Sequence, residues 1–314
     1  MAEGGARPRR LLAVAGGVAV LLLVGWALGG GHLGALTSSP ASGMPSATSA
    51  RASPSARTSP SPTTPSSPTA APTTRSGPAP GDPLTVVALG DSVPSAASCD
   101  CTGYVERLGA SLQRETGRPV TVHNDATGGW TTSDVEEDLG SPSTSRHLSS
   151  ADLVIIEVGA NDFDLDRVDD PACLPAATSS CWSSTMSDLR TGLSHIVSDI
   201  RAADRNAQVR IAVVGYWNVT VDGAVGQARG KSFVAGSDAL TRAVNTTIAG
   251  VASSLQAIYV DAYTPLKGDG SLDPTSALLD DGDHPNAKGH AIIAGAVLDA
   301  LTSAGAVATW TPRP

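Results

Sequence analysis

The sequence predicts an α/β domain, a three-layer α/β/α sandwich whose mainly parallel sheet has about five strands. Short runs rich in Val and Ile show little alternation of apolar and polar residues, which suits strands buried on both faces. Segments with helical apolar periodicity lie between these runs. Strands and helices that alternate in this way predict parallel strands joined by right-handed crossovers.

The predicted strands lie at residues 84–89, 120–123, 153–158, 209–214 and 258–260. The predicted helices lie at residues 104–116, 186–203, 237–255 and 287–304. Gly117 and Pro119 close the first of these helices, as residues that cannot continue a helix commonly do. Ligands of such sheets bind beyond the carboxyl ends of the strands, so a functional site is expected there.

The N-terminal residues predict export of the chain. Arg7, Arg9 and Arg10 precede a largely apolar run at residues 11–30. Twenty apolar residues in a helix span about 30 Å, the thickness of the bilayer core. The basic flank orients the segment with its N-terminus in the cytoplasm. We expect a single-pass protein of the cell membrane with an extracellular domain; a cleaved signal peptide, which would leave a secreted domain, stays open.

The chain divides into three predicted parts. Residues 1–36 are the basic tip and the transmembrane or signal segment, and residues 37–83 are a disordered linker rich in Ser, Thr and Pro. Residues 84–314 are of ordinary size for a single domain, and we expect a monomer. The net charge of −9 disfavours a nucleic-acid partner, because phosphate binding needs a basic patch.

The four cysteines all follow the linker: Cys99, Cys101, Cys173 and Cys181. An even number of cysteines outside the cytoplasm favours two disulfides. A zinc site is the weaker alternative, because tetrahedral structural sites usually separate both pairs by two to four residues. Only one residue separates Cys99 from Cys101, which is close for a disulfide between them to form without strain. The sequence leaves all three connectivities open.

One serine stands where chemistry is expected. Ser92 follows Gly90 and Asp91 at the end of the first predicted strand. A serine hydroxyl is a weak nucleophile that needs a base, and the base needs an orienting group. His284 precedes a predicted helix, and Asp281 lies three residues before it, so one turn can bring the carboxylate to the imidazole.

Two further segments at strand ends offer hydrogen-bond donors for a tetrahedral oxyanion. Gly128 and Gly129 follow the second strand and can expose backbone N–H groups. Asn161 follows the third strand and carries a side-chain amide.

Four blocks together resemble the SGNH/GDSL hydrolases: GDSV at residues 90–93, NDATGGWTT at 124–132, GAND at 159–162 and DGDHPN at 281–286. They stand in the family's order, with Val93 where the family name has leucine. The resemblance implies a flavodoxin-like fold, with Ser92 as nucleophile, His284 as general base and Asp281 as the orienting acid. It also implies an oxyanion hole of the Ser92 and Gly129 N–H groups and the Asn161 amide, with Gly128 as the alternative to Gly129.

The resemblance implies a serine esterase or lipase that forms an acyl-enzyme and needs no metal or organic cofactor. The substrate is then a small-molecule or polysaccharide ester. A carbohydrate O-deacetylase acting on acetylated polysaccharide is the alternative, and a catalytically silent surface binding module is the weaker one. Trp130, Tyr216 and Trp217 are expected either to line a sugar or acyl site or to pack in the core. Residues 164–184, with two cysteines, are expected to form a disulfide-pinned loop over the site.

Overall fold

A computed structural model of the chain describes residues 82–312, except 165–166, 169, 171, 174–179 and 204–207. Five parallel strands form one sheet in the order β2-β1-β3-β4-β5. The strands are β1 (Leu84–Gly90), β2 (Val120–Asn124), β3 (Leu153–Glu157), β4 (Arg210–Val214) and β5 (Ile258–Val260). All five predicted strands are confirmed, with ends that differ by one residue at most.

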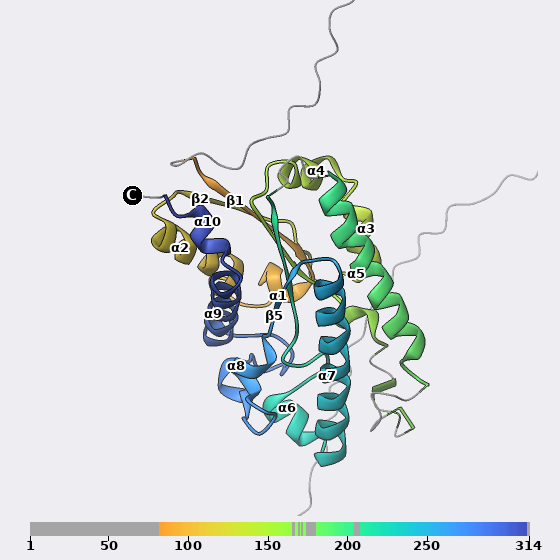
Figure 1. The fold of residues 1–314 in the computed structure, drawn as a ribbon. Coiled ribbons are helices and arrows are strands. Elements are labelled where there is room, and N and C mark those ends of the chain that lie inside the picture. The colour runs from red at the N-terminus through yellow and green to blue at the C-terminus, as the bar shows by residue number, and fades with distance from the viewer. Residues whose placement is uncertain are drawn as a thin grey trace, which may run out of the picture. The chain divides into compact units, whose positions relative to one another are not determined.

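The α-helices of the described residues are α1 (Ser92–Ser95), α2 (Tyr104–Thr116), α3 (Thr132–Asp138), α4 (Pro142–Leu148), α5 (Ser183–Ala203), α6 (Gly223–Ala228), α7 (Lys231–Ser254), α8 (Tyr263–Lys267), α9 (Ala287–Ser303) and α10 (Ala306–Trp310). Helices α2, α9 and α10 pack together on one side of the sheet, and α3, α4, α5 and α7 on the other (Figure 1). The sheet is therefore the middle of three layers, which confirms the predicted fold class.

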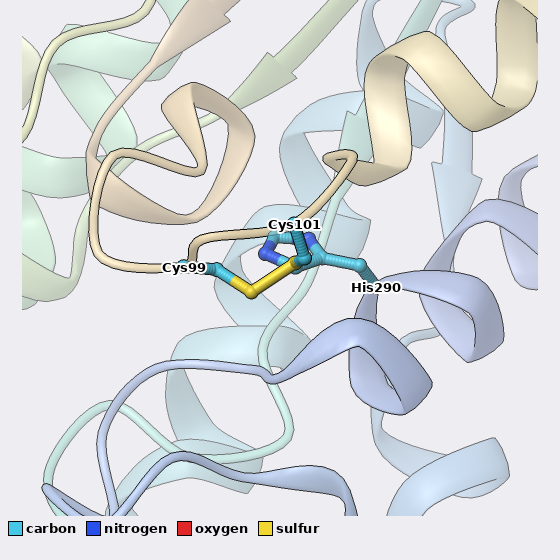
Figure 2. A group of neighbouring side chains, drawn as sticks. All are labelled: Cys99, Cys101 and His290. Carbon is cyan, nitrogen blue, oxygen red and sulfur yellow. A yellow bond between two sulfur atoms is a disulfide. The ribbon is translucent and has the colours of Figure 1, made fainter.

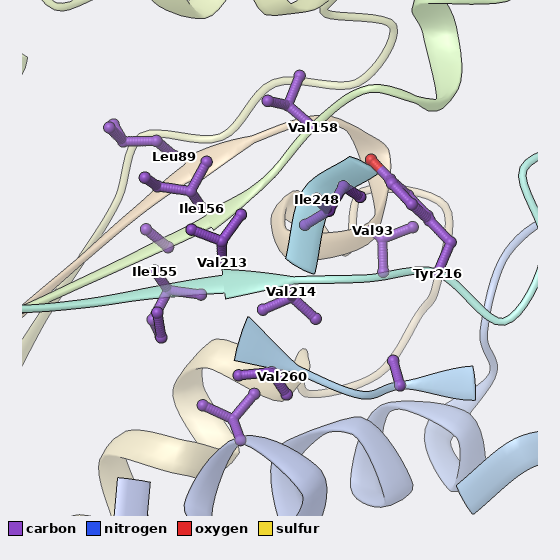
Figure 3. Packing of buried hydrophobic residues seen from close by; sticks show 14 of the residues in the cluster. Leu89, Val93, Ile155, Ile156, Val158, Val213, Val214, Tyr216, Ile248 and Val260 are labelled. Carbon is purple, nitrogen blue, oxygen red and sulfur yellow. The ribbon is translucent and has the colours of Figure 1, made fainter. Parts of the chain in front are cut away.

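Burial on both faces explains the composition of the strands. Every residue of β3 is buried, and its Ile155 and Ile156 side chains point to opposite faces, as they must in a strand (Figure 3). Helix α5 supplies a stripe of buried residues at helical spacing: Leu189, Gly192, Leu193, Ile196, Val197 and Ile200. Each fully buried aliphatic side chain of this kind stabilises the fold by about 1.5–3 kcal/mol.

Helices α3 and α4 were not predicted, because local capping rather than apolar periodicity defines them. Thr131 and Asp134 form a reciprocal capping box at the start of α3. Ser141 caps α4, and Pro142 occupies its first turn. Each helix buries one large apolar side chain, so the pattern in the sequence is weak.

The predicted N-terminal segment of residues 1–36 lies outside the described residues, as do residues 37–81 of the predicted linker. Within the described part of the chain, no helix combines the length and the apolar character that a membrane span requires.

The strand order determines where a ligand can bind. The chain passes from β1 to β2 on one side and then crosses back to β3 on the other side of β1, so the direction of the connections reverses there. This is the switch point of a flavodoxin-like sheet, where a crevice opens beyond the carboxyl ends of the strands. Ser92 follows β1 and Asn161 follows β3.

Candidate active site

Ser92 is the first residue of α1, directly beyond β1. Gly90 makes the turn possible: it has a φ of +144°, and a Cβ there would lie 1.9 Å from the Glu157 carbonyl oxygen of β3. The buried Asp91 then caps α1, because its Oδ1 accepts a hydrogen bond of 3.0 Å from the Val93 N–H. Ser92 is thereby fixed at the carboxyl edge of the sheet, half-buried.

The segment after β2 runs beside the end of β1 and brings two glycines to Ser92. The Thr127 N–H donates to the Gly90 carbonyl at 3.0 Å. A Cβ placed on Gly128 would lie 3.8 Å from the Ser92 Cβ, so these backbones are neighbours. Gly129 has a φ of +85°, which disfavours any residue but glycine, and faces open space.

Asn161 lies in a short 3₁₀ turn, η1 (Ala160–Asp162), directly beyond β3. Its amide Nδ2 donates a hydrogen bond of 2.9 Å to the carbonyl oxygen of Trp130. An amide nitrogen carries two hydrogens, so one donor of Asn161 remains for a ligand. Asp162 ties the same two segments together, because it accepts hydrogen bonds from the N–H and the hydroxyl of Thr132.

His284 and Asp281 form a hydrogen-bonded pair in the loop before α9. The His284 Nδ1 lies 2.8 Å from the Asp281 Oδ2 and 4.0 Å from the nearest Asp283 carboxylate oxygen. Burial raises the pKa of Asp281, but hydrogen bonds from the His284 and Asp283 N–H groups and the imidazole outweigh it, so that the pKa is lowered. Asp281 is thus a carboxylate that fixes the Nδ1–H tautomer of His284.

The Asp281–His284 loop lies close to the Ser92 segment. Asp91, next to Ser92 in sequence, is in electrostatic contact with both Asp283 and His284. Among the described residues, neither the Ser92 hydroxyl nor the His284 Nε2 makes a hydrogen bond. Bonds between catalytic side chains are often long without substrate and tighten when it binds.

Tyr216 makes two hydrogen bonds at the site that the sequence did not indicate. It is buried beyond β4, and its hydroxyl donates to the Asp91 Oδ2 at 2.6 Å. The same hydroxyl accepts from the Ala160 N–H at 3.4 Å. Burial raises the pKa of Asp91 to about 6, although the Tyr216 and Val93 hydrogen bonds oppose this shift. Tyr216 and Trp217 are both core residues, so neither lines a surface site.

The buried side chains of Glu157 and Tyr104 form a second polar group near Asp91. Burial, with the nearby Asp91 carboxyl adding to it, raises the pKa of Glu157 well above its usual range. The Tyr104 hydroxyl lies near Glu157, outside regular hydrogen-bond geometry. The His290 ring stacks on Tyr104, with ring centroids 6.3 Å apart. Burial lowers the pKa of His290 to about 4, so its imidazole is neutral near pH 7.

The structure pairs the four cysteines as two local disulfides, Cys99–Cys101 and Cys173–Cys181. The first closes the loop between α1 and α2, one turn beyond Ser92, and lies beside the His290 ring of α9 (Figure 2). The second closes part of the segment 164–184, of which residues 165–166, 169, 171 and 174–179 lie outside the described residues. The expected position of this segment over the site stays a prediction.

The residues of this candidate site all lie within the segment that identifies the protein family. The model of the GDSL-like lipase/acylhydrolase family matches residues 88–292, from the end of β1 into α9. The chain belongs to this family. Membership confirms the predicted SGNH/GDSL identity and the prediction that the chain is a carboxylic ester hydrolase. No curated protein matches the chain.

Solved structures share the fold of this GDSL-family domain. The lipase Lip_vut3 from a goat rumen metagenome is 18% identical, covering 69% of this chain and 97% of that chain at a TM-score of 0.53. LAE5, an α/β hydrolase enzyme from the metagenome of Lake Arreo, is 21% identical, covering 73% and 97% at a TM-score of 0.50. A catalytic mutant of Axe2, an acetylxylan esterase from Geobacillus stearothermophilus, is 18% identical, covering 74% and 98% at a TM-score of 0.49. At their identities, the first two structures show a likeness of fold alone.

Proposed function

We propose that the chain hydrolyses carboxylic esters with Ser92 as nucleophile, His284 as general base and Asp281 as the carboxylate that orients the base. The observation that carries the proposal is the 2.8 Å hydrogen bond between Asp281 and the His284 Nδ1, since in the neutral imidazole a proton on Nδ1 makes Nε2 the acceptor for a serine hydroxyl. The electrostatic contact between His284 and Asp91 supports the approach of Nε2 to Ser92.

In the first half of the reaction, the Ser92 Oγ attacks the ester carbonyl carbon while the His284 Nε2 takes the hydroxyl proton. The carbonyl oxygen becomes an oxyanion, which the N–H groups of Ser92 and Gly129 and the free amide hydrogen of Asn161 stabilise. The tetrahedral intermediate collapses, the C–O bond to the alcohol breaks, and the imidazolium returns its proton to the departing alcohol. Asp281 stays ionised throughout and stabilises the imidazolium.

In the second half, water attacks the Ser92 acyl-enzyme while His284 takes one water proton. The second tetrahedral intermediate collapses, His284 returns the proton to the Ser92 Oγ, and the carboxylic acid leaves. Gly128 lies next to the Ser92 Cβ, so this turn brings backbone donors to Ser92, and the family resemblance assigns the donor to Gly129. The contact between Asn161 and the Trp130 carbonyl supports the assignment of Asn161, because it holds the amide beside Gly129.

A pocket whose lining includes Trp130, the neighbour of Gly129 in sequence, supports a polar ester as the substrate. It has a volume of about 530 Å³ and is lined by Trp130, Asp134, Glu137, Asp138, Gly140 and Ser141. An aromatic side chain among carboxylates and a hydroxyl suits a sugar, whose apolar face packs on the ring while its hydroxyls donate to the acids. A carbohydrate O-deacetylase is therefore the second candidate function, with the same Ser92 chemistry.

We also propose that the hydrolase domain acts outside the cytoplasm, either tethered to the membrane or secreted after cleavage. The basic tip and the apolar run at residues 11–30 support export. Two disulfides and the absence of free cysteine among the described residues support an oxidising compartment.

Hydrolysis of p-nitrophenyl acetate, butyrate and palmitate and of acetylated xylan, by the wild type and by Ser92→Ala, tests the proposal. We expect ester hydrolysis that Ser92→Ala lowers by at least about a thousandfold. Acetate release from xylan with little palmitate hydrolysis would favour the deacetylase. A folded wild type that hydrolyses none of these esters would favour a binding module.

A further inference from the structure

A hollow bounded by α6, α7 and the end of α8 is distinct from the proposed active site. It is lined by residues from 222–238 and 267–274, and its volume of about 530 Å³ is in the usual range of small-molecule sites. Helices α6 and α8 lie side by side and both contact the turn η3 (Pro274–Ala277), which closes the hollow (Figure 1). Ser92 and His284 are not part of its lining.

The floor of the hollow is a buried network of charges. Lys267 ends α8, and its side chain is 4% exposed. Its Nζ lies 2.7 Å from the Asp222 Oδ2 and 3.0 Å from the Asp238 Oδ1. Buried ion pairs of this kind often add little to stability, because the cost of removing both charges from water offsets their attraction. The stability of the fold alone therefore does not explain three charged groups at the bottom of a cavity.

This network offers both a donor and acceptors to a ligand. Two carboxylates take two of the three hydrogens on the Lys267 ammonium group, so one hydrogen remains for a ligand. Burial raises the pKa of Asp238, but hydrogen bonds from Arg242, Tyr263 and Lys267 outweigh it, so that the pKa is lowered. Asp238 is thus a carboxylate that only accepts hydrogen bonds. A hydroxyl group donates and accepts, so it can bond the ammonium and a carboxylate at once.

The charges of the lining disfavour an ionic ligand. The lining includes the carboxylates of Asp222, Asp238 and Asp273 and the ammonium groups of Lys231 and Lys267. An anion would lie against the carboxylates, and a cation would lie against Lys267. Burying either charge beside a like charge is costly. A neutral ligand with several hydroxyl groups avoids both penalties.

Apolar side chains complete the lining. Leu272 is 55% exposed, and among the described residues it is the one large apolar side chain that solvent reaches so freely. Val234 and Pro274 line the same hollow. A sugar ring carries hydroxyl groups at its edge and C–H groups on its face, so it matches the charged floor and the apolar side chains together.

We propose that this hollow binds neutral glycosyl units, with Lys267 and Asp238 bonding the sugar hydroxyls and Leu272 packing on the sugar face. The hollow adjoins the loop of the proposed catalytic pair, because the Asp222 N–H donates to the carbonyl of Gly282 at 2.8 Å and Gly282 follows Asp281. A sugar bound here holds an esterified polysaccharide beside that loop. This use of the site rests on the proposed function, whereas sugar binding itself does not.

Isothermal titration of the full-length chain with xylotriose and cellotriose, which carry no ester, tests the proposal. Ala235→Trp puts a bulky ring into the hollow from an exposed position of α7, and we expect the affinity to fall at least about tenfold. Leu272→Ala should lower the affinity by about threefold to tenfold. Ala202→Trp, at an exposed position of α5 outside the lining, is the matched control and should bind as the wild type does. Circular dichroism establishes that each variant is folded.

Charged trisaccharides test the class of ligand. A glucosamine trimer, which is cationic at mildly acid pH, and a galacturonic acid trimer, which is anionic, should each bind at least about tenfold more weakly than the neutral sugars. Tighter binding of either charged sugar overturns the proposal, as does a folded wild type that binds neither neutral sugar.

Two variants show which pocket holds the sugar. Binding that Ala235→Trp leaves unchanged and Trp130→Ala removes would place the sugar in the pocket of Trp130 and overturn the proposal. Binding that Ala235→Trp removes and Trp130→Ala retains supports it. A chain that binds these sugars in the hollow but hydrolyses no ester would contradict the proposed function and leave this proposal supported.

Discussion

The Tyr216 hydroxyl donates a hydrogen bond of 2.6 Å to the Asp91 Oδ2 and so ties the core beyond β4 to the segment that carries Ser92. The same hydroxyl accepts from the Ala160 N–H, next to Asn161. One buried side chain thereby holds the proposed nucleophile and a proposed oxyanion donor in a fixed relation, although it lies on neither segment.

Removing this hydroxyl should slow the chemical step. Tyr216→Phe leaves the ring packed but cuts the link between Asp91 and Ala160, so we expect kcat to fall about tenfold, or about 1.4 kcal/mol, with KM little changed. Tyr104→Phe is the control, because that equally buried hydroxyl makes no regular hydrogen bond. Steady-state kinetics on p-nitrophenyl acetate measure both. Equal effects of the two variants would count against the positioning role.

Removing the charge of Asp281 should lower kcat far more than removing the charge of Asp283. Asp281→Asn removes the charge bonded to Nδ1, and we expect kcat to fall by about a hundredfold to ten-thousandfold. Asp283→Asn changes a carboxylate 4.0 Å away and should lower kcat by less than about fivefold. A larger loss in Asp283→Asn than in Asp281→Asn would reverse the assignment.

Substitution of the two glycines after β2, Gly128 and Gly129, should lower kcat to different extents. Gly129→Ala places a side chain at a φ of +85°, which strains the backbone and shifts the proposed N–H donor. Gly128→Ala adds a methyl group in ordinary contact with Ser92. We expect kcat to fall about tenfold or more in Gly129→Ala and by less in Gly128→Ala. The opposite order, from kinetics on the same ester, would make Gly128 the donor.

The buried Asp91 should make stability depend on pH. Its pKa is about 6 in the folded chain against 3.8 for a free carboxyl, so its contribution to stability is present in full below about pH 4. This contribution is lost as the pH rises to about 6, and two pH units correspond to about 3 kcal/mol. Asp91→Asn keeps a side-chain oxygen that can cap α1 but cannot ionise, so this variant serves as the reference.

Urea denaturation of both proteins between about pH 4 and about pH 7 checks this expectation. The free energy of unfolding of the wild type should fall relative to that of Asp91→Asn as the pH rises through this window. Parallel pH profiles would show that Asp91 ionises as easily in the folded chain as in the unfolded one.

The strands and the long helices could be predicted because their patterns are strong. Residues 84–89 and 153–158 are apolar except for Thr85 and Glu157, and residues 104–116 carry a clear helical period. The pairing of Asp281 with His284 is local and follows from their spacing. Helices α3 and α4 were missed because caps define them.

Contacts between distant segments could not be predicted. The link from Tyr216 to Asp91 joins positions 125 residues apart in sequence. It arises from the order β1-β3-β4 in the sheet, which brings the ends of separate strands together. Likewise, His290 meets Cys99 and Cys101 because α9 packs against α2. The cysteine pairing also required the structure, since the spacing allowed three connectivities.

Acylation of Ser92, with His284 as the base, is the step on which the proposed ester hydrolysis depends. Mass spectrometry of the full-length chain after treatment with a fluorophosphonate, which reacts with activated serines, tests it most directly. We expect one adduct per chain, on the peptide that contains Ser92, with labelling absent in Ser92→Ala and much slower in His284→Gln. No adduct on folded wild type, or an adduct on another serine, would show that Ser92 is not the nucleophile.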